Sequence, residues 1–158
     1  MFRELARKKQ ALSHETCIEI LKTEPRGVLS VIGDDGYPYG VPMNFWYCEE
    51  DGKIYFHSGK IGHKIDALKA CDKVSFCVYD KGWQEENDWA LHIQSVIVFG
   101  KVELVADREK TVAVSRKLSL KYTPDEAYID AEIAAYADAT MVFALNPEHM
   151  TGKTVYEK

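Results

Sequence analysis

The sequence lacks the long apolar segments and the cysteine patterns that mark several protein classes. None of its apolar runs approaches the ~20 residues that a membrane-spanning helix needs, so we expect no such helix and no membrane partner. Its four cysteines form no CxxC pair and no tight group with histidines, so we expect no metal site and no redox pair. We expect free thiols, buried or half-buried, at Cys17, Cys48, Cys71 and Cys77.

Several functional signatures are also absent. Neither the GxxxxGK[ST] loop nor the GxGxxG fingerprint occurs, and no Ser/His/Asp triad or carboxylate pair identifies a general acid or base. The net charge of −5 and a pI of about 5.5 argue against nucleic acid as a partner. The chain starts MFRELARKKQALS, which has no apolar signal core, so we expect the protein in the cytoplasm. Because the net charge is negative, any anionic ligand must be held by a local site.

The length of 158 residues fits one domain, 1–158, which would bury roughly two-thirds of its unfolded surface. Residues 1–12 form a basic N-terminal lead. Residues 107–138 form a helical insert, in which we expect one helix over 107–122 and another over 123–137. A further helix is expected between Ser13 and Thr23.

The rest of the chain is mostly strand after strand. Tight turns at Asp34-Asp35-Gly36 and Glu50-Asp51-Gly52 separate early β-rich runs, and such short connections exclude parallel crossovers. The pattern favours a mainly-β fold, an antiparallel β-barrel with peripheral helices. Gly100 predicts a bulge within the longest run. The predicted strands are 27–33, 37–47, 54–57, 73–79, 89–105 and 140–145.

The stretch Ile54–Leu68 joins an apolar strand to a polar turn and then to an amphipathic helix, with Ile61 at helical spacing. Cations collect near the helix start, where the helix dipole normally disfavours them by up to ~1 kcal/mol. A phosphate at this turn would reverse that penalty by meeting free N–H groups and the Ser58 hydroxyl. The alternative is an ordinary strand-to-helix turn with solvated charges. The candidate cations are His57, Lys60, His63 and Lys64.

Two other segments are candidates for contact with a ligand or a partner. Gly40 and two prolines lie in the run 37–47, so the outer backbone of Val41–Phe45 could face a planar ligand, or form a bare edge strand. The polar loop 80–88 carries Trp83, with Trp89 just beyond it. These tryptophans indicate a lid, a subunit contact or a simple hydrophobic anchor.

Taken together, these segments resemble the FMN-binding split-barrel superfamily, specifically the pyridoxamine 5′-phosphate oxidase-related branch that includes the nitroimidazole-resistance proteins. The resemblance covers most of the chain and implies an antiparallel, Greek-key-like split barrel. The matching segments are GVLSVIGDDGYPYGVPMNFWY, GKIYFHSGKIGHKIDALK, KVSFCVY and QSVIVFGKVELV, in the order and at the spacing of the family.

The resemblance also implies a cofactor site and a homodimer with two flavins at the subunit interface. The FMN phosphate would lie at the turn already singled out, against His57, Ser58, His63 and Lys64. The isoalloxazine ring would lie along the second strand and near the start of the long strand. The residues concerned are Val41, Pro42, Met43, Asn44, Gln94 and Ser95.

The sequence departs from the pyridoxamine oxidases proper, which carry arginine with lysine at the phosphate turn. Here His63 and Lys64 occupy that place, and no counterpart of the substrate-phosphate arginines is found, so pyridoxamine 5′-phosphate oxidation is not expected. We expect an FMN-dependent oxidoreductase that passes electrons from a nicotinamide or another donor to a small acceptor, such as a nitro compound. The alternatives are a non-enzymatic FMN- or haem-binding module, with His57, His63 or His92 as iron ligand, or a barrel with a purely structural dimer interface.

Overall fold

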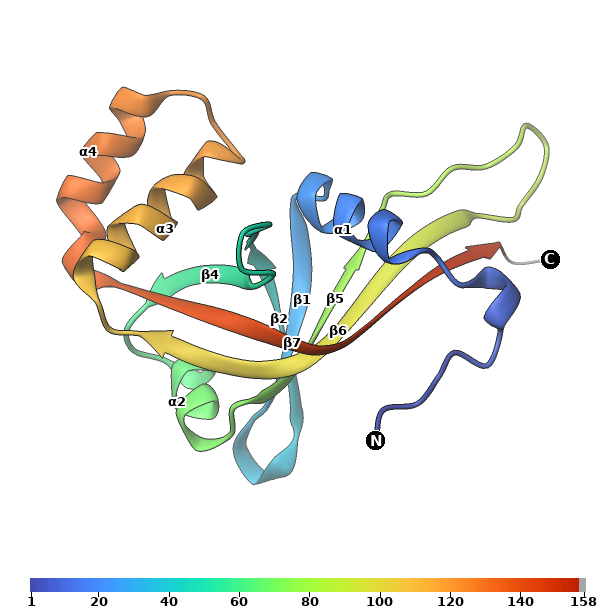
Figure 1. Ribbon diagram of the computed structural model, residues 1–158, viewed down its shortest axis with the longest axis horizontal. Helices are drawn as coiled ribbons and strands as arrows, with labels where there is room; N and C mark the ends of the chain where they lie inside the picture. The colour runs from blue at the N-terminus through green and yellow to red at the C-terminus, as the bar shows by residue number, and fades with distance from the viewer. Residues whose placement is uncertain (157–158) are drawn as a thin grey trace.

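One antiparallel sheet of seven strands runs through the structure, a computed structural model that describes residues 1–156 (Figure 1). The strand order across the sheet is β2-β1-β5-β6-β7-β4-β3. The strands are β1 (Arg26–Ile32), β2 (Pro38–Asn44), β3 (Trp46–Tyr47), β4 (Ile54–Gly59), β5 (Lys73–Tyr79), β6 (His92–Val105) and β7 (Thr140–Tyr156).

Phe45 joins the two edges of this sheet. Strand β2 ends at Asn44 and pairs with β1, whereas β3 begins at Trp46 and pairs with β4 at the opposite edge. The chain therefore crosses from one edge to the other at a single, fully buried residue. This crossing requires the sheet to curl on itself, and the prediction of a mainly-β, antiparallel split barrel is confirmed.

The sequence predicted a tight turn at Asp34-Asp35-Gly36 and a bulge at Gly100, and the structure has both. Asp35 (φ 55°) and Gly36 (φ 77°) occupy the left-handed region in the turn between β1 and β2. The register of β6 against β7 shifts between Phe99 and Gly100. A Cβ at Gly100 would collide with the backbone of Asn146, so only glycine permits this close approach.

Within the described residues, four α-helices surround the barrel. They are α1 (His14–Thr23), α2 (His63–Ala70), α3 (Arg108–Leu120) and α4 (Glu126–Tyr136). Ser13 caps α1 by accepting a hydrogen bond from the Thr16 N–H at 3.1 Å, and Asp107 caps α3 through the Lys110 N–H at 2.6 Å. Figure 1 shows α3 and α4 side by side at one end of the sheet.

The core fills the inside of the barrel. Phe76 packs edge-on against Phe45 and Phe56, with ring centroids 4.9 and 5.0 Å apart, and Phe143 stacks on Phe56. Leu21 of α1 and residues of α2 join this cluster, so both helices contribute to the barrel core. Helices α3 and α4 belong to the other side of the sheet, where Val114 packs with Tyr55 and Val142 in a separate cluster.

Several element boundaries differ from the predictions. The single strand expected over 37–47 is wrong, because Phe45 divides it into β2 and β3 at opposite edges of the sheet. Strand β7 continues to Tyr156 instead of ending at Leu145, because Pro147, which reads as a strand breaker, lies opposite the bulge at Gly100. Strand β6 begins at His92, since residues 89–91 belong to the preceding loop. Helix α2 begins only at His63.

Ile61 was expected on the apolar face of that helix, and this expectation is wrong. Its side chain is 94% exposed and lies outside α2. Gly62, with φ 130°, precedes the helix in a conformation that α-helical residues do not adopt, so the helix cannot extend back to Ile61.

The four cysteines are free thiols, as predicted: Cys17 and Cys48 are buried, whereas Cys71 and Cys77 are half-buried. Among residues 1–156, no helix has the length and apolar character needed to cross a membrane.

Candidate functional site

The turn between β4 and α2 keeps the features of an anion site. Ser58 lies at the end of β4, where its hydroxyl donates to the carbonyl oxygen of Gly59 at 2.9 Å. The N-cap residue of α2 is Gly62, which has no side chain to accept from the first N–H groups of the helix. An anion at this end of the helix would therefore meet backbone donors that no side chain caps.

Lys64 is the cation that this turn presents most clearly. It is half-buried in the first turn of α2, and burial lowers the pKa of its ammonium group. A bound phosphate would offset the cost of that burial by pairing with the charge. Because Lys64 is partly removed from water, its ammonium group gains more from pairing with an anion than a fully solvated surface lysine would.

His57 faces away from Ser58. Adjacent residues of a strand point to opposite sides of a sheet, and His57 lines a cavity beneath α4 on the outer side of β4. Burial, followed by the charge of Lys64, lowers the pKa of its imidazole. The His57 side chain was expected at the phosphate with Ser58, and the structure places it on the opposite side of β4 instead.

His63 points toward the hairpin between β1 and β2. Its ring stacks on Tyr39 with centroids 4.3 Å apart, and its Nε2 accepts a hydrogen bond from the Asp34 N–H at 3.4 Å. A Cβ at Gly33 would lie 3.0 Å from that nitrogen, so the glycine makes room for the imidazole. His63 therefore fixes the hairpin against α2.

Strand β2 is an edge strand of the sheet, as expected for a segment whose backbone could meet a ligand. Val41 and Met43 turn their side chains into the core, whereas Pro42 is exposed and Asn44 is half-buried. The carbonyl oxygen of Pro42 accepts a hydrogen bond from the Arg26 guanidinium at 3.2 Å. Val41 and Met43 could thus reach a planar ligand only through their backbone groups.

Gln94 and Ser95 lie far from the other predicted site residues. They are near the start of β6, where the Gln94 N–H donates to the Asp80 carboxylate at 3.0 Å. Ser58 lies near the opposite end of β6. It pairs with Met141 of β7, and the next residue, Val142, pairs with Val105 at the end of β6. Ten residues of strand separate Ser95 from Val105, which corresponds to roughly 33 Å along β6.

The sheet order also separates Ser95 from β2. Two strands, β1 and β5, lie between β2 and β6, so the backbones of β2 and β6 are about 14 Å apart at the usual strand spacing. The residues predicted to surround one flavin are therefore not gathered in one place by a single chain.

The three histidines considered as iron ligands lie in three different environments. His57 lines the cavity beneath α4, and His63 stacks on Tyr39. His92 stacks on Trp83 with ring centroids 3.9 Å apart, and the two residues exchange backbone hydrogen bonds. The three imidazoles therefore lie in three separate parts of the fold.

The sequence matches a known protein family over most of its length. Residues 13–154 match the family described as pyridoxamine 5′-phosphate oxidase. The chain belongs to this family. The resemblance drawn from the four sequence segments is thereby confirmed. No curated protein matches the chain.

Solved structures share the same fold. A candidate 5-nitroimidazole antibiotic resistance protein from Bacteroides thetaiotaomicron superposes with a TM-score of 0.77 at 24% identity, over 92% of this chain and 87% of that one. The flavocytochrome Anf3 from Azotobacter vinelandii gives 0.79 at 21% identity, over 97% and 72%. A FAD and haem binding protein from Mycobacterium smegmatis gives 0.72 at 20% identity, over 92% and 73%.

Sequence reasoning did not single out the residues that face His57 from the helical insert. They include Ser115 of α3 and Glu132 of α4. The helical period could have placed them on one face of each helix, but nothing in the sequence indicates that this face covers β4. Their proximity to His57 depends on the tertiary fold.

Proposed function

We propose that this protein is a homodimeric flavoprotein that binds FMN non-covalently and acts as an oxidoreductase. The observation that carries the proposal is the separation of the predicted site within one chain. Ser58, Lys64 and the edge of β2 form one part, and Gln94 with Ser95 forms another about 33 Å away along β6. A second copy could bring its own Gln94 and Ser95 to the first part.

The residues at the β4–α2 turn fit a phosphate. The uncapped start of α2 and the half-buried Lys64 ammonium provide donors and a compensating charge. The Ser58 hydroxyl would join them by turning from the Gly59 carbonyl oxygen, to which it donates in the structure. The phosphate of FMN carries about −1.5 to −2 charges at neutral pH. When bound, the flavin would supply the hydride and electron transfer, while this chain would hold its phosphate and ring edge.

A partly uncovered face of the sheet supports the proposed dimer. Ile97 and Phe99 of β6 point outward and are partly exposed, and Tyr79 of β5 is exposed on the same face. Phe2 stacks on Phe99 with ring centroids 5.6 Å apart, so the N-terminal segment covers part of this face. The half-buried Cys77 lies between Val28 and Ile97 on the same face. An apolar sheet surface of this kind is typical of a subunit contact.

The family and its structural relatives support a flavin as the cofactor. Relatives of the same fold are described as a flavocytochrome and as a FAD and haem binding protein. We propose FMN, because the site described above provides for one phosphate. Electrons would come from a nicotinamide or another small donor.

The acceptor in this proposal is a small molecule, and a nitro compound is the specific candidate. It rests on the likeness to the structure described as a 5-nitroimidazole antibiotic resistance protein. Steady NAD(P)H oxidation that requires both flavin and an added nitroimidazole would support it. Flavin binding without any such turnover would favour a non-enzymatic flavin-binding module.

The flavin site is tested by the double variant Ser58→Ala with Lys64→Ala. We expect the fold to persist and the dissociation constant for FMN to rise at least tenfold, because a hydroxyl donor and a paired charge are lost. Flavin absorbance after dialysis measures retention. Lys69→Ala, in the last turn of the same helix, is the control and should retain flavin as the parent does. Equal flavin content in the double variant and the parent would contradict the site.

A further inference from the structure

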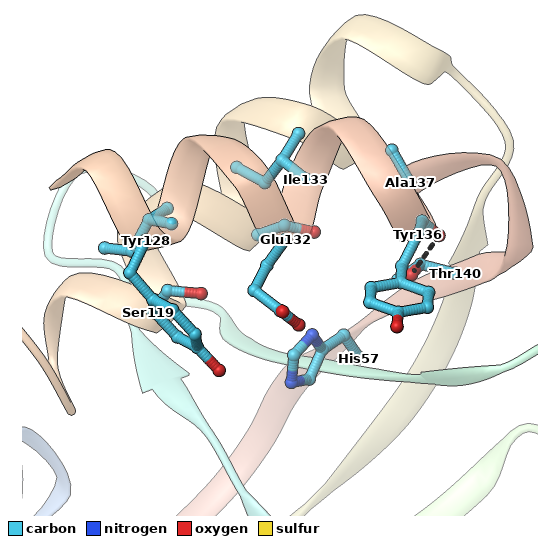
Figure 2. A pocket seen from close by; sticks show the side chains of 10 residues that line it. His57, Ser119, Tyr128, Glu132, Ile133, Tyr136, Ala137 and Thr140 are labelled. Atoms are coloured by element: carbon cyan, nitrogen blue, oxygen red, sulfur yellow. Dashed lines mark hydrogen bonds between the residues drawn. The ribbon is translucent and has the colours of Figure 1, made fainter. Parts of the chain in front are cut away.

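A cavity of about 220 Å³ lies between β4 and the helical insert. Figure 2 shows its arrangement: His57 rises from β4, Glu132 points from α4 toward it, and Tyr128 and Tyr136 stand on either side. This volume suits a small molecule with a single ring. The remaining lining residues are Ser115, Ser119, Ile129, Ile133, Ala137 and Thr140.

Ser115 is a buried polar group that lines this cavity without a partner. It is only 7% exposed, and its Oγ has no hydrogen-bond partner among residues 1–156. Buried hydroxyl groups in proteins are nearly always satisfied. By contrast, the Thr140 hydroxyl donates to the Tyr136 carbonyl at 2.8 Å, so it is already engaged. Ser115 is thus a hydroxyl in the wall of the cavity that the fold leaves unsatisfied, and a small rotation of its side chain would bring it to a ligand there.

The charged residues that line the cavity favour a cation over an anion. Glu132 is the one acidic residue among the lining residues, which include no lysine or arginine. Burial and the nearby charge of Lys64 lower the pKa of His57, so its imidazole is neutral and offers an acceptor nitrogen. The faces of Tyr128 and Tyr136 are negative and attract a flat cation.

We propose that this cavity binds a small planar organic cation bearing N–H donors, of the amidinium or protonated aromatic amine class. Glu132 would pair with the positive charge, and Ser115 and His57 would accept from its N–H groups. Ile129, Ile133 and the tyrosine rings would enclose its apolar part. This inference concerns a second ligand and does not depend on flavin binding.

The test uses benzamidine, with benzamide as its neutral counterpart and benzoate as its anionic one. Isothermal titration calorimetry of the purified full chain, with and without FMN, measures binding. We expect benzamidine to bind at least tenfold more tightly than benzamide and benzoate not to bind. Benzoate binding as tight as that of benzamidine, or no benzamidine binding, would overturn the proposal.

Variants locate the site. Glu132→Gln should weaken benzamidine at least tenfold and leave benzamide unchanged, whereas Glu126→Gln, in the first turn of the same helix, should bind as the parent does. Ser115→Ala should weaken benzamidine severalfold without lowering the melting temperature, because the hydroxyl it removes has no partner in the fold. Unchanged benzamidine affinity in both Glu132→Gln and Ser115→Ala would overturn the assignment.

Discussion

Lys121 illustrates how a single ammonium group can hold a junction of the chain. Its Nζ lies 3.6 Å from the centre of the Phe45 ring and donates hydrogen bonds to the carbonyl oxygens of Phe45 (3.1 Å) and Leu21 (3.4 Å). Burial lowers the pKa of this lysine to about 8, against an ordinary value of 10.5. The charge therefore both anchors Phe45 and carries a desolvation cost.

This cost makes stability depend on pH. Between pH 8 and 10.5 the unfolded chain binds more protons at Lys121 than the folded chain, so the contribution of this residue to stability rises with pH through that window. Lys121→Met should remove this rise. Because Lys121 is only half-buried, we expect the parent to gain about 1 kcal/mol relative to the variant across the window.

Urea denaturation at a series of pH values checks this prediction. The difference between parent and variant is the quantity to follow, because raised pKa values of Cys17 and Tyr122 oppose the trend in both proteins. Lys117→Met, at an exposed position of α3, should show no such pH-dependent difference. A Lys121→Met protein with the same pH profile as the parent would contradict the assignment.

At the residue scale, the sequence predicts which side chains gather at the site but not all of their contacts. The cluster of Ser58, His63 and Lys64 at a helix start could be predicted from types and spacing alone. That His57 points away from Ser58 follows from the two-residue period of a strand. The stacking of His63 on Tyr39 could not be predicted, since it depends on how the β1–β2 hairpin folds over α2.

At the scale of elements, the crossing at Phe45 depends on the end of α3. The Tyr122 hydroxyl follows that helix, accepts a hydrogen bond from the Phe45 N–H at 2.9 Å and donates to the Pro25 carbonyl at 2.5 Å. Phe45 lies between β2 and β3, where no partner strand satisfies its N–H. A side chain therefore takes the place of the sheet ladder.

Tyr122→Phe should destabilise the fold by about 1–3 kcal/mol, because it leaves a buried N–H without an acceptor. The midpoint of urea unfolding measures this effect. Tyr37→Phe makes the same chemical change at an exposed tyrosine and should stay within about 0.5 kcal/mol of the parent. Equal stability of the two variants would show that another group satisfies the Phe45 N–H.

Elements with local signals were predicted best. Ser13 and Asp107 mark the helix starts because their side chains cap the first turn, and the Asp35-Gly36 turn requires residues that tolerate positive φ. The second half of β7 has no such local signal. It is a strand because β6 pairs with it along its length, and Pro147 is tolerated at the bulge.

At the scale of the whole molecule, the outer side of the sheet has two parts with different surroundings. The part beneath α3 and α4 is covered by an apolar cluster that includes Tyr55 and Val114. The outward face of β5 and β6 presents Cys77, Ile97 and Phe99 instead. A second copy of the chain on this face would remove that apolar surface from water and complete the proposed flavin site.

Ile97→Lys tests whether assembly and flavin binding are one event. Ile97 is 39% exposed, so a lysine should leave the folded protomer within about 0.5 kcal/mol of the parent. In a dimer about a two-fold axis, the same substitution appears on both copies, so two desolvated charges would oppose association. We expect a monomer by light scattering and at least a tenfold loss of FMN affinity.

Leu120→Lys is the matched control, because Leu120 is 38% exposed but lies on α3, away from the outward face of β5 and β6. It should remain dimeric and retain flavin. An Ile97→Lys protein that stays dimeric would show that the interface lies elsewhere. A monomeric Ile97→Lys protein with full FMN affinity would show that one chain is sufficient, and Gln94 and Ser95 of a second copy would then have no part in the site.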